Sequence, residues 1–478
     1  MIEFAQPPNL RRLLAILIAV GVSVAPAQAQ LTGAHPPVKS APITFAEITS
    51  KLRISLPAID YPSAATTLPA LIRSGEYSLD YARRHLVPAM GGSVAVGDFD
   101  HDGHPDLYVV VPGGSNHLFR NRADGTFEEV TSKARVSGTG SDLAAAFADF
   151  DHSGHPSLFV AGLGGVTLYH NNGDGTFTDT TEKAGLKGKP GELATSALLF
   201  DAENDGFLDL LVTVYTDLSV PPAKSTFTFP NDFSGANSHL YRNRHDGTFL
   251  EITEAAGLSW NPGRTHKAVA ADFNHNGRLD LLLLRDNKPP ALYRNQGRSE
   301  FEDQTWDAGK EIWKYAYVDA QTSDFNHDGK IDVALWSTVG NEVLVNQGQG
   351  KFEQDESLPL VYAANRAFGF HGLVADLNRD GYDDLLTVDS KEDWHFIVNH
   401  AGRFEEAPIT WSPALNAAKA SGPNKGAQSI PAFASLTAVW LRNEGRPVLF
   451  GLTMDGRIAA FEEQPVRARN EPHPAQVK

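Results

Sequence analysis

Short apolar segments with period-two alternation recur along the chain. One unit reads SVAVG at 93–97, LYVVV at 107–111, HLFRN at 117–121 and TFEEVT at 126–131. Such alternation predicts short β-strands, each with one buried face. An Asp-Gly pair at 124–125 separates the last two segments and favours a hairpin turn. The unit therefore predicts four antiparallel strands.

This unit repeats with a nearly constant period. An acidic loop follows the first strand of each copy, and its first Asp stands at positions 98, 149, 201, 272, 324 and 376, in steps of 51, 52, 71, 52 and 52. A seventh copy, RNEGRPVLFGLTMDGRIAAFEEQ, keeps the strand pattern but has lost the acidic residues. A period of about fifty residues with four strands per repeat predicts an all-β fold, a seven-bladed β-propeller of four-stranded antiparallel blades.

The seventh copy ends after its third strand, and the N-terminus supplies a candidate for the fourth. Residues 43–54 match residues 125–136 nearly position for position. We predict that 43–54 is the closing strand of blade seven, which hides two sheet edges, within a propeller that spans 91–465. An independent strand is the alternative. We predict that residues 55–90 form an insertion with a short helix. Residues 466–478 are predicted to form a flexible tail.

The loop after each first strand carries a fixed set of oxygen-bearing side chains. In five copies, of which DFDHDGHPD at 98–106 is the first, acidic or Asn residues occupy loop positions one, three, five and nine, with Gly at position six. Carboxylate and amide oxygens suit Ca²⁺, and the Gly allows a tight turn that brings the position-seven carbonyl to the ion. The predicted metal ligands, with position seven acting through its carbonyl, are Asp98, Asp100, Asp102, His104, Asp106, Asp201, Glu203, Asp205, Phe207, Asp209, Asp272, Asn274, Asn276, Arg278, Asp280, Asp324, Asn326, Asp328, Lys330, Asp332, Asp376, Asn378, Asp380, Tyr382 and Asp384.

Other interpretations of these loops are an EF-hand, a Mg²⁺ site and a turn that binds no ion. Strand-like flanks distinguish them from EF-hands, and Mg²⁺ fits less well because it retains its waters. Turns that bind nothing are the remaining alternative, since Asp, Asn and Gly favour turns. We expect about five calcium sites. Whether the loop of the second copy binds calcium stays open, because Asp149 and Asp151 are accompanied there by Ser153 and Ser157 in place of acids.

Charge and composition narrow the possible partners. The formal net charge is -17, from 41 basic and 58 acidic residues, which argues against nucleic acid or anionic lipid as a partner. The chain has no cysteine, which excludes disulfides and thiolate metal sites. Calcium ions bound to the acidic loops would neutralise much of the negative charge of the chain.

The N-terminus has the layout of a secretory signal. Two Arg residues precede the apolar run 13–24, and an A-x-A cleavage site follows at 27–29. We predict a signal peptide over 1–29 and a linker over 30–42. The apolar run is shorter than the ~18 residues of a membrane span. We therefore expect an exported monomer, secreted or periplasmic, without a membrane span.

The repeats resemble a known family. The stretches HLVPAMGGSVAVGDFDHDGHPDLYV and LYRNRHDGTFLEITEAAGL are similar to the FG-GAP or VCBS repeats of integrin α-type propellers, and particularly to bacterial secreted relatives of cartilage acidic protein. The resemblance covers roughly residues 43–465 and implies calcium between the first two strands of a blade. It also implies a role in binding or adhesion.

The blade topology divides the loops between two faces. Connections between strands one and two, and three and four, share the acidic-loop face, whereas the remaining connections share the opposite, variable face. Recognition residues concentrate on loops held by a rigid scaffold, and aromatic rings beside Arg and His suit sugars or peptides. The same rings also serve as packing between blades. The candidates are Arg264, His266, Trp313, Tyr315, Arg366 and His371.

The sequence favours a binding protein over an enzyme. It contains no HExxH, GxSxG, GxGxxG or GxxxxGK[ST] motif, and no catalytic residue is assigned. We expect an exported calcium-binding scaffold that recognises a protein or carbohydrate ligand. The alternative is a propeller enzyme acting on polysaccharide, of the lyase or sugar dehydratase type, with His, Tyr and Arg on the variable face.

Overall fold

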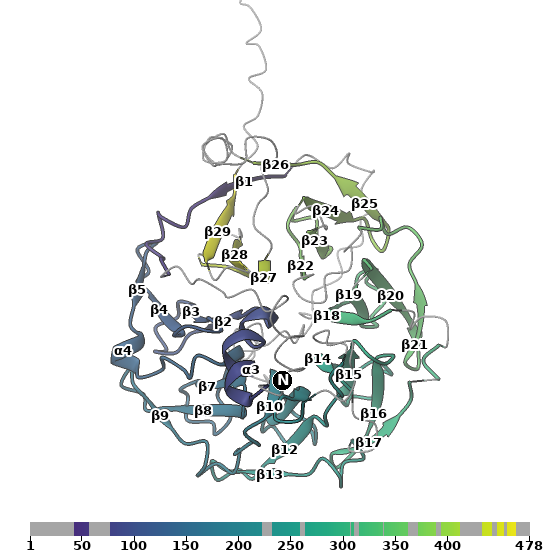
Figure 1. The fold of residues 1–478 in the computed structure, drawn as a ribbon. Coiled ribbons are helices and arrows are strands. Elements are labelled where there is room, and N and C mark those ends of the chain that lie inside the picture. The colour runs from purple at the N-terminus through teal and green to yellow at the C-terminus, as the bar shows by residue number, and fades with distance from the viewer. Residues whose placement is uncertain are drawn as a thin grey trace, which may run out of the picture.

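The strands of the computed structural model form seven sheets arranged as blades around a ring (Figure 1). This confirms the predicted seven-bladed β-propeller. The predicted signal peptide, linker and C-terminal tail lie outside the described residues. The structure describes residues 43–56, 77–221, 232–258, 263–305, 307–309, 315–337, 339–361, 371–388, 393–411, 433–441, 447–453 and 457–464.

Blades one to six each consist of four antiparallel strands in chain order, with the first strand near the axis and the fourth at the rim (Figure 1). Blade one comprises β2 (Ser93–Gly97), β3 (Asp106–Val110), β4 (His117–Asn121) and β5 (Phe127–Glu129). Blade two comprises β6 (Asp142–Ala148), β7 (Ser157–Gly162), β8 (Gly165–Asn171) and β9 (Phe177–Asp179). Blade three comprises β10 (Glu192–Phe200), β11 (Asp209–Asp217), β12 (His239–Asn243) and β13 (Phe249–Glu251).

The next three blades repeat this order. Blade four comprises β14 (Thr265–Ala271), β15 (Asp280–Arg285), β16 (Ala291–Gly297) and β17 (Glu300–Asp303). Blade five comprises β18 (Tyr317–Ser323), β19 (Asp332–Ser337), β20 (Asn341–Gly348) and β21 (Lys351–Gln354). Blade six comprises β22 (Gly372–Ala375), β23 (Asp384–Val388), β24 (Trp394–Asn399) and β25 (Phe404–Ala407).

Blade seven joins the two ends of the propeller. The N-terminal strand β1 (Ile43–Glu47) pairs antiparallel with β29 (Ile458–Glu463), beside β28 (Val448–Thr453) and β27 (Phe433–Val439). The predicted closure by an N-terminal strand is therefore confirmed. The sequence did not predict a fifth strand, β26 (Ile409–Trp411), which pairs parallel to β1 and continues from blade six.

The hydrophobic core lies between neighbouring blades, because each sheet presents apolar side chains to both adjacent sheets. Tyr108 and Leu118 of blade one share a buried cluster with Phe147 and Leu158 of blade two. Equivalent clusters join the later blades, and Phe45 of β1 extends one of them between blades six and seven. Each blade is therefore held by its neighbours.

A short helix lies against the variable face. Helix α3 (Leu79–His85) begins after the N-cap Ser78 and is followed by the turn η2 (Pro88–Met90). Ala82 and Leu86 pack on Leu143 and Leu193, which stand at the variable-face ends of β6 and β10. The helix therefore covers part of blades two and three on the face opposite the acidic loops (Figure 1). A second short helix, α4 (Thr131–Ala134), follows blade one.

Candidate functional site

The acidic loops have one register in six blades. In blade one Gly97, just before loop position one, pairs with Asp106 at position nine, and blades two to six repeat this pairing. The eight intervening residues form a closed loop on one face. The repeated sequence pattern therefore produces a repeated three-dimensional arrangement.

The position-one carboxylate organises each loop. Asp98 Oδ1 accepts a hydrogen bond from Asp102 N at 3.0 Å, and Oδ2 accepts one from Gly103 N at 2.8 Å. The turn needs left-handed backbone at positions four and six, with φ of 60° at His101 and 86° at Gly103. The same pair of bonds is formed by Asp201, Asp272, Asp324 and Asp376.

The predicted ligands at position seven also have a common geometry. Their backbone N–H groups donate to the side chain at position five, which holds the peptide of each of these residues within the turn. This bond is made by His104, Phe207, Arg278, Lys330 and Tyr382.

The position-nine carboxyls are buried and accept backbone hydrogen bonds. Asp106 accepts from Phe99 N at 3.0 Å and from Asn121 N at 2.7 Å. Burial raises the pKa of Asp106 and Asp384 to about 8, although the backbone donors act in the opposite direction. It also raises the pKa of Asp209 and Asp332 to about 7 and that of Asp280 to about 6. A cation nearby would favour their ionised form.

Blade one provides the best fit to a divalent cation. Asp98, Asp100 and Asp106 each offer a carboxylate oxygen, and these three oxygens lie within 4.8 Å of one another. Asp100 Oδ1 is buried and has no hydrogen-bond partner. Clustered carboxylate oxygens with unused acceptor capacity are the donor set that Ca²⁺ prefers. Across the described residues, this is the one such group of acidic or His ligand atoms.

Basic side chains also enter these loops. Arg120 of β4 lies with Nε 2.5 Å from Asp100 Oδ2 and Nη2 3.2 Å from Asp102 Oδ2. In blade five Lys330 Nζ lies 2.5 Å from Asp328 Oδ2. These cations neutralise part of the acidic charge that calcium would neutralise.

The second and fourth blades have fewer carboxylates. In blade two Ser153 Oγ donates to Asp149 Oδ1 at 3.4 Å, and His170 Nδ1 lies 3.4 Å from Asp151 Oδ2. In blade four Asn274 Nδ2 donates to the buried Asp280 Oδ2 at 2.7 Å. The loops therefore share a backbone but differ in charge.

Comparison with known proteins identifies the repeats. A family model described as FG-GAP-like repeat matches residues 98–160, 149–212, 231–283 and 324–387. The chain carries FG-GAP-like repeats. Each matched segment contains an acidic loop followed by the second strand of a blade, so the resemblance predicted from the sequence is confirmed.

The related proteins that this chain matches share only part of their length with it. Human cartilage acidic protein 1 is 27% identical over 169 residues, which cover 33% of this chain and 25% of that protein. Human integrin alpha-11 is 28% identical over 174 residues, which cover 33% of this chain and 13% of the integrin. The solved structure of an Agrocybe aegerita lectin that recognises non-reducing terminal N-acetylglucosamine aligns with a TM-score of 0.43 and 18% identity, over 65% of this chain and 78% of the lectin.

A buried Asn, which was not predicted from the sequence, links consecutive blades. Asn295 in β16 donates through Nδ2 to Ala202 O of the preceding blade at 2.8 Å and to Leu279 O at 3.1 Å, and its Oδ1 accepts from Gly297 N at 2.8 Å. The signal was present as an Asn at or near the end of the third strand in blades one to six. The equivalent bonds to the preceding blade are made by Asn171, Asn243, Asn346 and Asn399.

Two candidates on the variable face belong to a buried ionic network. Arg264 Nε lies 2.6 Å from Asp286 Oδ1, and His266 Nε2 lies 3.1 Å from Asp286 Oδ2. Tyr215 OH donates to the same carboxylate at 2.5 Å. This arrangement does place His, Tyr and Arg together, but Arg264 and Tyr215 are only 4% and 0% exposed. The network joins the strands of blades three and four.

The other variable-face candidates are more accessible or not described. His371 Nδ1 lies 3.0 Å from Asp319 Oδ2, which Lys267 Nζ also approaches, at 2.7 Å from Oδ1. Tyr315 is 37% exposed. Trp313 and Arg366 lie outside the described residues. None of the helices in the described residues is long and apolar enough to cross a membrane.

Proposed function

We propose that this FG-GAP repeat protein is an exported, calcium-binding propeller that serves as a recognition scaffold for a protein or carbohydrate ligand. The observation that carries the calcium part is the cluster of Asp98, Asp100 and Asp106, with a buried carboxylate oxygen that has no hydrogen-bond partner. Calcium would supply the positive charge that this cluster requires. The side chains at positions one, three, five and nine would hold it in the other copies.

The architecture supports a scaffold role. The inter-blade clusters and Asn bonds hold the blades together, and loops on such a frame are suited to recognition. Helix α3 covers the variable face over blades two and three, so we place the recognition surface over blades four to six, where Tyr315 and His371 remain accessible. Export follows from the predicted signal peptide.

Calorimetric titration of the metal-stripped protein with calcium tests the metal sites. We expect about five sites with dissociation constants of ~0.1 to 1 mM, the range of extracellular modules. Replacing Asp98→Asn together with Asp100→Asn should remove one site. Asp124→Asn, in an exposed hairpin turn of the same blade, is the matched control and should remove none. Absence of binding heat, or equal stoichiometry in all three proteins, would reject the calcium proposal.

A binding screen against glycans and extracellular proteins, with and without calcium, tests the scaffold role. Saturable binding without turnover supports recognition. Conversion of a polysaccharide into products with new ultraviolet absorption would instead identify a lyase.

A further inference from the structure

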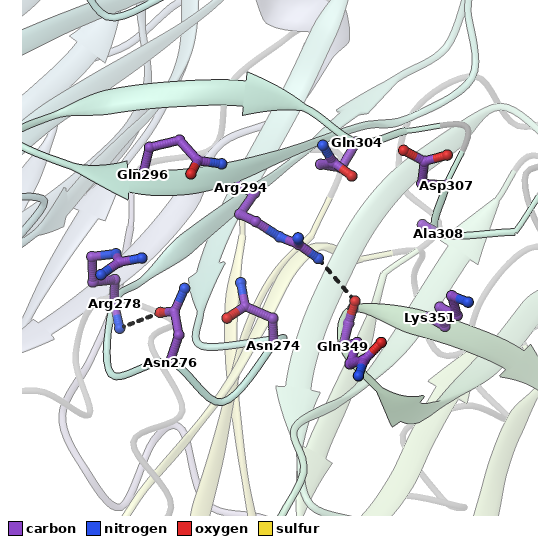
Figure 2. A pocket seen from close by; sticks show the side chains of 11 residues that line it. Asn274, Asn276, Arg278, Arg294, Gln296, Gln304, Asp307, Ala308, Gln349 and Lys351 are labelled. Atoms are coloured by element: carbon purple, nitrogen blue, oxygen red, sulfur yellow. Dashed lines mark hydrogen bonds between the residues drawn. The ribbon is translucent and has the colours of Figure 1, made fainter.

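A polar pocket of about 460 Å³ lies on the acidic-loop face, between the outer strands of blades four and five. Its walls come from the acidic loop of blade four, from β16, from the segment after β17 and from the turn between β20 and β21 (Figure 2). Ala308 is the single apolar side chain among the lining residues. The pocket therefore offers hydrogen-bonding groups and little hydrophobic surface.

The pocket is basic although the chain is acidic. Arg278, Arg294 and Lys351 line it, with Asp307 as the one carboxylate of the lining, while the whole chain has a net charge of -17. Arg278 Nε donates to Asn295 O at 2.9 Å. Arg294 Nη2 donates to Gln349 O at 2.9 Å (Figure 2). Within the described part of the chain, none of these three cations forms an ion pair. Their positive charge is therefore available to a ligand.

The repeat explains why this positive charge appears in blade four. Arg294 occupies the position of Arg120 in blade one, which pairs with Asp100 and Asp102. The equivalent Arg242 in blade three lies 3.8 Å from Glu203.

In blade four the acids at loop positions three and five are replaced by neutral Asn274 and Asn276. Asn274 donates a hydrogen bond to Asp280, whereas Asp100 at the same loop position of blade one pairs with Arg120. Arg294 consequently extends toward blade five, where it contacts a backbone carbonyl (Figure 2). Because the acids at loop positions three and five are absent from blade four, the Arg294 guanidinium lies in the pocket between the two blades.

We propose that this pocket binds an acidic saccharide, with the cationic side chains of Arg294, Arg278 and Lys351 meeting its carboxylate or sulfate group. Guanidinium groups bind planar and tetrahedral oxyanions through paired hydrogen bonds. The amides of Gln304 and Gln349 both donate and accept, which suits sugar hydroxyls. An acidic peptide is a poorer match, because Ala308 is the one apolar side chain that lines the pocket. The inference rests on the proposed scaffold role, to which it adds a second binding surface on the face opposite the variable one, and it does not depend on calcium.

Calorimetric titration with defined probes tests the pocket. The probes are a sulfated heparin-derived hexasaccharide, a hexamer of galacturonic acid, neutral maltohexaose and a hexaglutamate peptide, at low ionic strength, in EDTA and again in calcium. We expect saturable binding of the sulfated or the carboxylated hexasaccharide, and the stronger of the two identifies the acidic group. Binding of neither, equal binding of maltohexaose, or preferential binding of the peptide would overturn the proposal.

Three double substitutions locate the site. Arg294→Gln with Lys351→Gln should weaken binding of the acidic saccharide at least tenfold. The control is Arg122→Gln with Arg244→Gln, which removes the same charge at exposed positions of blades one and three and should change the affinity less than twofold. Asn274→Asp with Asn276→Asp restores the acids of blade one and should also weaken binding about tenfold in EDTA, by recapturing Arg294. Equal affinity in all these proteins would place the ligand elsewhere.

Thermal melts of each variant check that the fold is retained. If the probes bind but calcium does not, the calcium proposal fails and the pocket assignment stands. If calcium binds but no acidic saccharide does, the pocket assignment fails and the calcium proposal stands.

Discussion

At the scale of single residues, buried polar side chains set the register between blades. Asn295 is fully buried, and its amide satisfies carbonyls from two blades. We expect Asn295→Ala to destabilise the fold by about 2 kcal/mol, because it leaves buried backbone groups unpaired. Urea unfolding measures the loss, with the exposed neighbour variant Gln296→Ala as control. A loss equal to that of the control would mean that the inter-blade bond contributes nothing to stability.

A second residue-scale prediction concerns pH. Burial acts to raise the pKa of Asp319, but Lys267 and His371 more than offset this and lower it to about 2. Because the folded pKa lies below the usual 3.8, the ionised carboxylate stabilises the fold above about pH 4, and this contribution is lost as the pH falls toward 2.

Replacing this residue should show that dependence. We expect Asp319→Asn to cost about 3 kcal/mol at neutral pH, since it leaves two basic groups without their carboxylate, and the difference from the wild type should shrink near pH 3. Urea unfolding at both pH values tests this, with Glu353→Gln on the surface as control. A pH-independent difference would show that packing and not charge is responsible.

Arg120 gives a third residue-scale prediction. Its guanidinium lies beside Asp100 and Asp102, where calcium is proposed to bind. Replacing it by Gln should raise the calcium affinity of blade one several-fold, because the ion no longer competes with an internal cation. Arg122→Gln, an exposed change of the same charge, is the control in the calcium titration. Weaker calcium binding by the Arg120 variant would show that Arg120 assists the site.

At the scale of secondary-structure elements, closure of the ring depends on β1. Its Phe45 is fully buried in a cluster with Phe396 of blade six and Phe461 of blade seven. We expect Phe45→Ala to cost about 4 kcal/mol, the usual range for an aromatic residue lost from a core. Glu47→Ala, at the exposed end of the strand, should change stability by less than about 0.5 kcal/mol. Similar values for both variants would mean that β1 is dispensable.

The sequence predicted these elements unevenly, for physical reasons. Blades, acidic loops and the closing strand were predictable because the pattern repeats and each copy supports the others. The parallel strand β26 was not, since its three residues carry no periodic signal and pair only with a strand distant in sequence. The inter-blade Asn and the basic pocket were also missed, because their partners lie in the neighbouring repeat, and partner choice is fixed by assembly of the ring.

At the scale of the whole molecule, one backbone carries loops of different charge. At loop positions one, three, five and nine, the loops of blades one and three have four carboxylates each, whereas that of blade four has two. By charge alone, blades one and three should bind calcium most tightly and blade four most weakly. The smaller number of carboxylates also lowers the repulsion that an anionic ligand meets at blade four. Metal binding and ligand binding can thus be distributed over one ring without a change of fold.

The ring as a whole should therefore depend on calcium for its stability. A site with a dissociation constant of ~0.1 mM contributes about 1.4 kcal/mol at ~1 mM calcium, so about five sites contribute roughly 7 kcal/mol. For a chain of this size that corresponds to a melting temperature lowered by about 8 °C in EDTA. Differential scanning calorimetry in calcium, magnesium and EDTA measures this, and magnesium should restore less than calcium because it retains its waters. Equal melting temperatures in calcium and EDTA would mean that the acidic loops are turns stabilised by their own backbone hydrogen bonds.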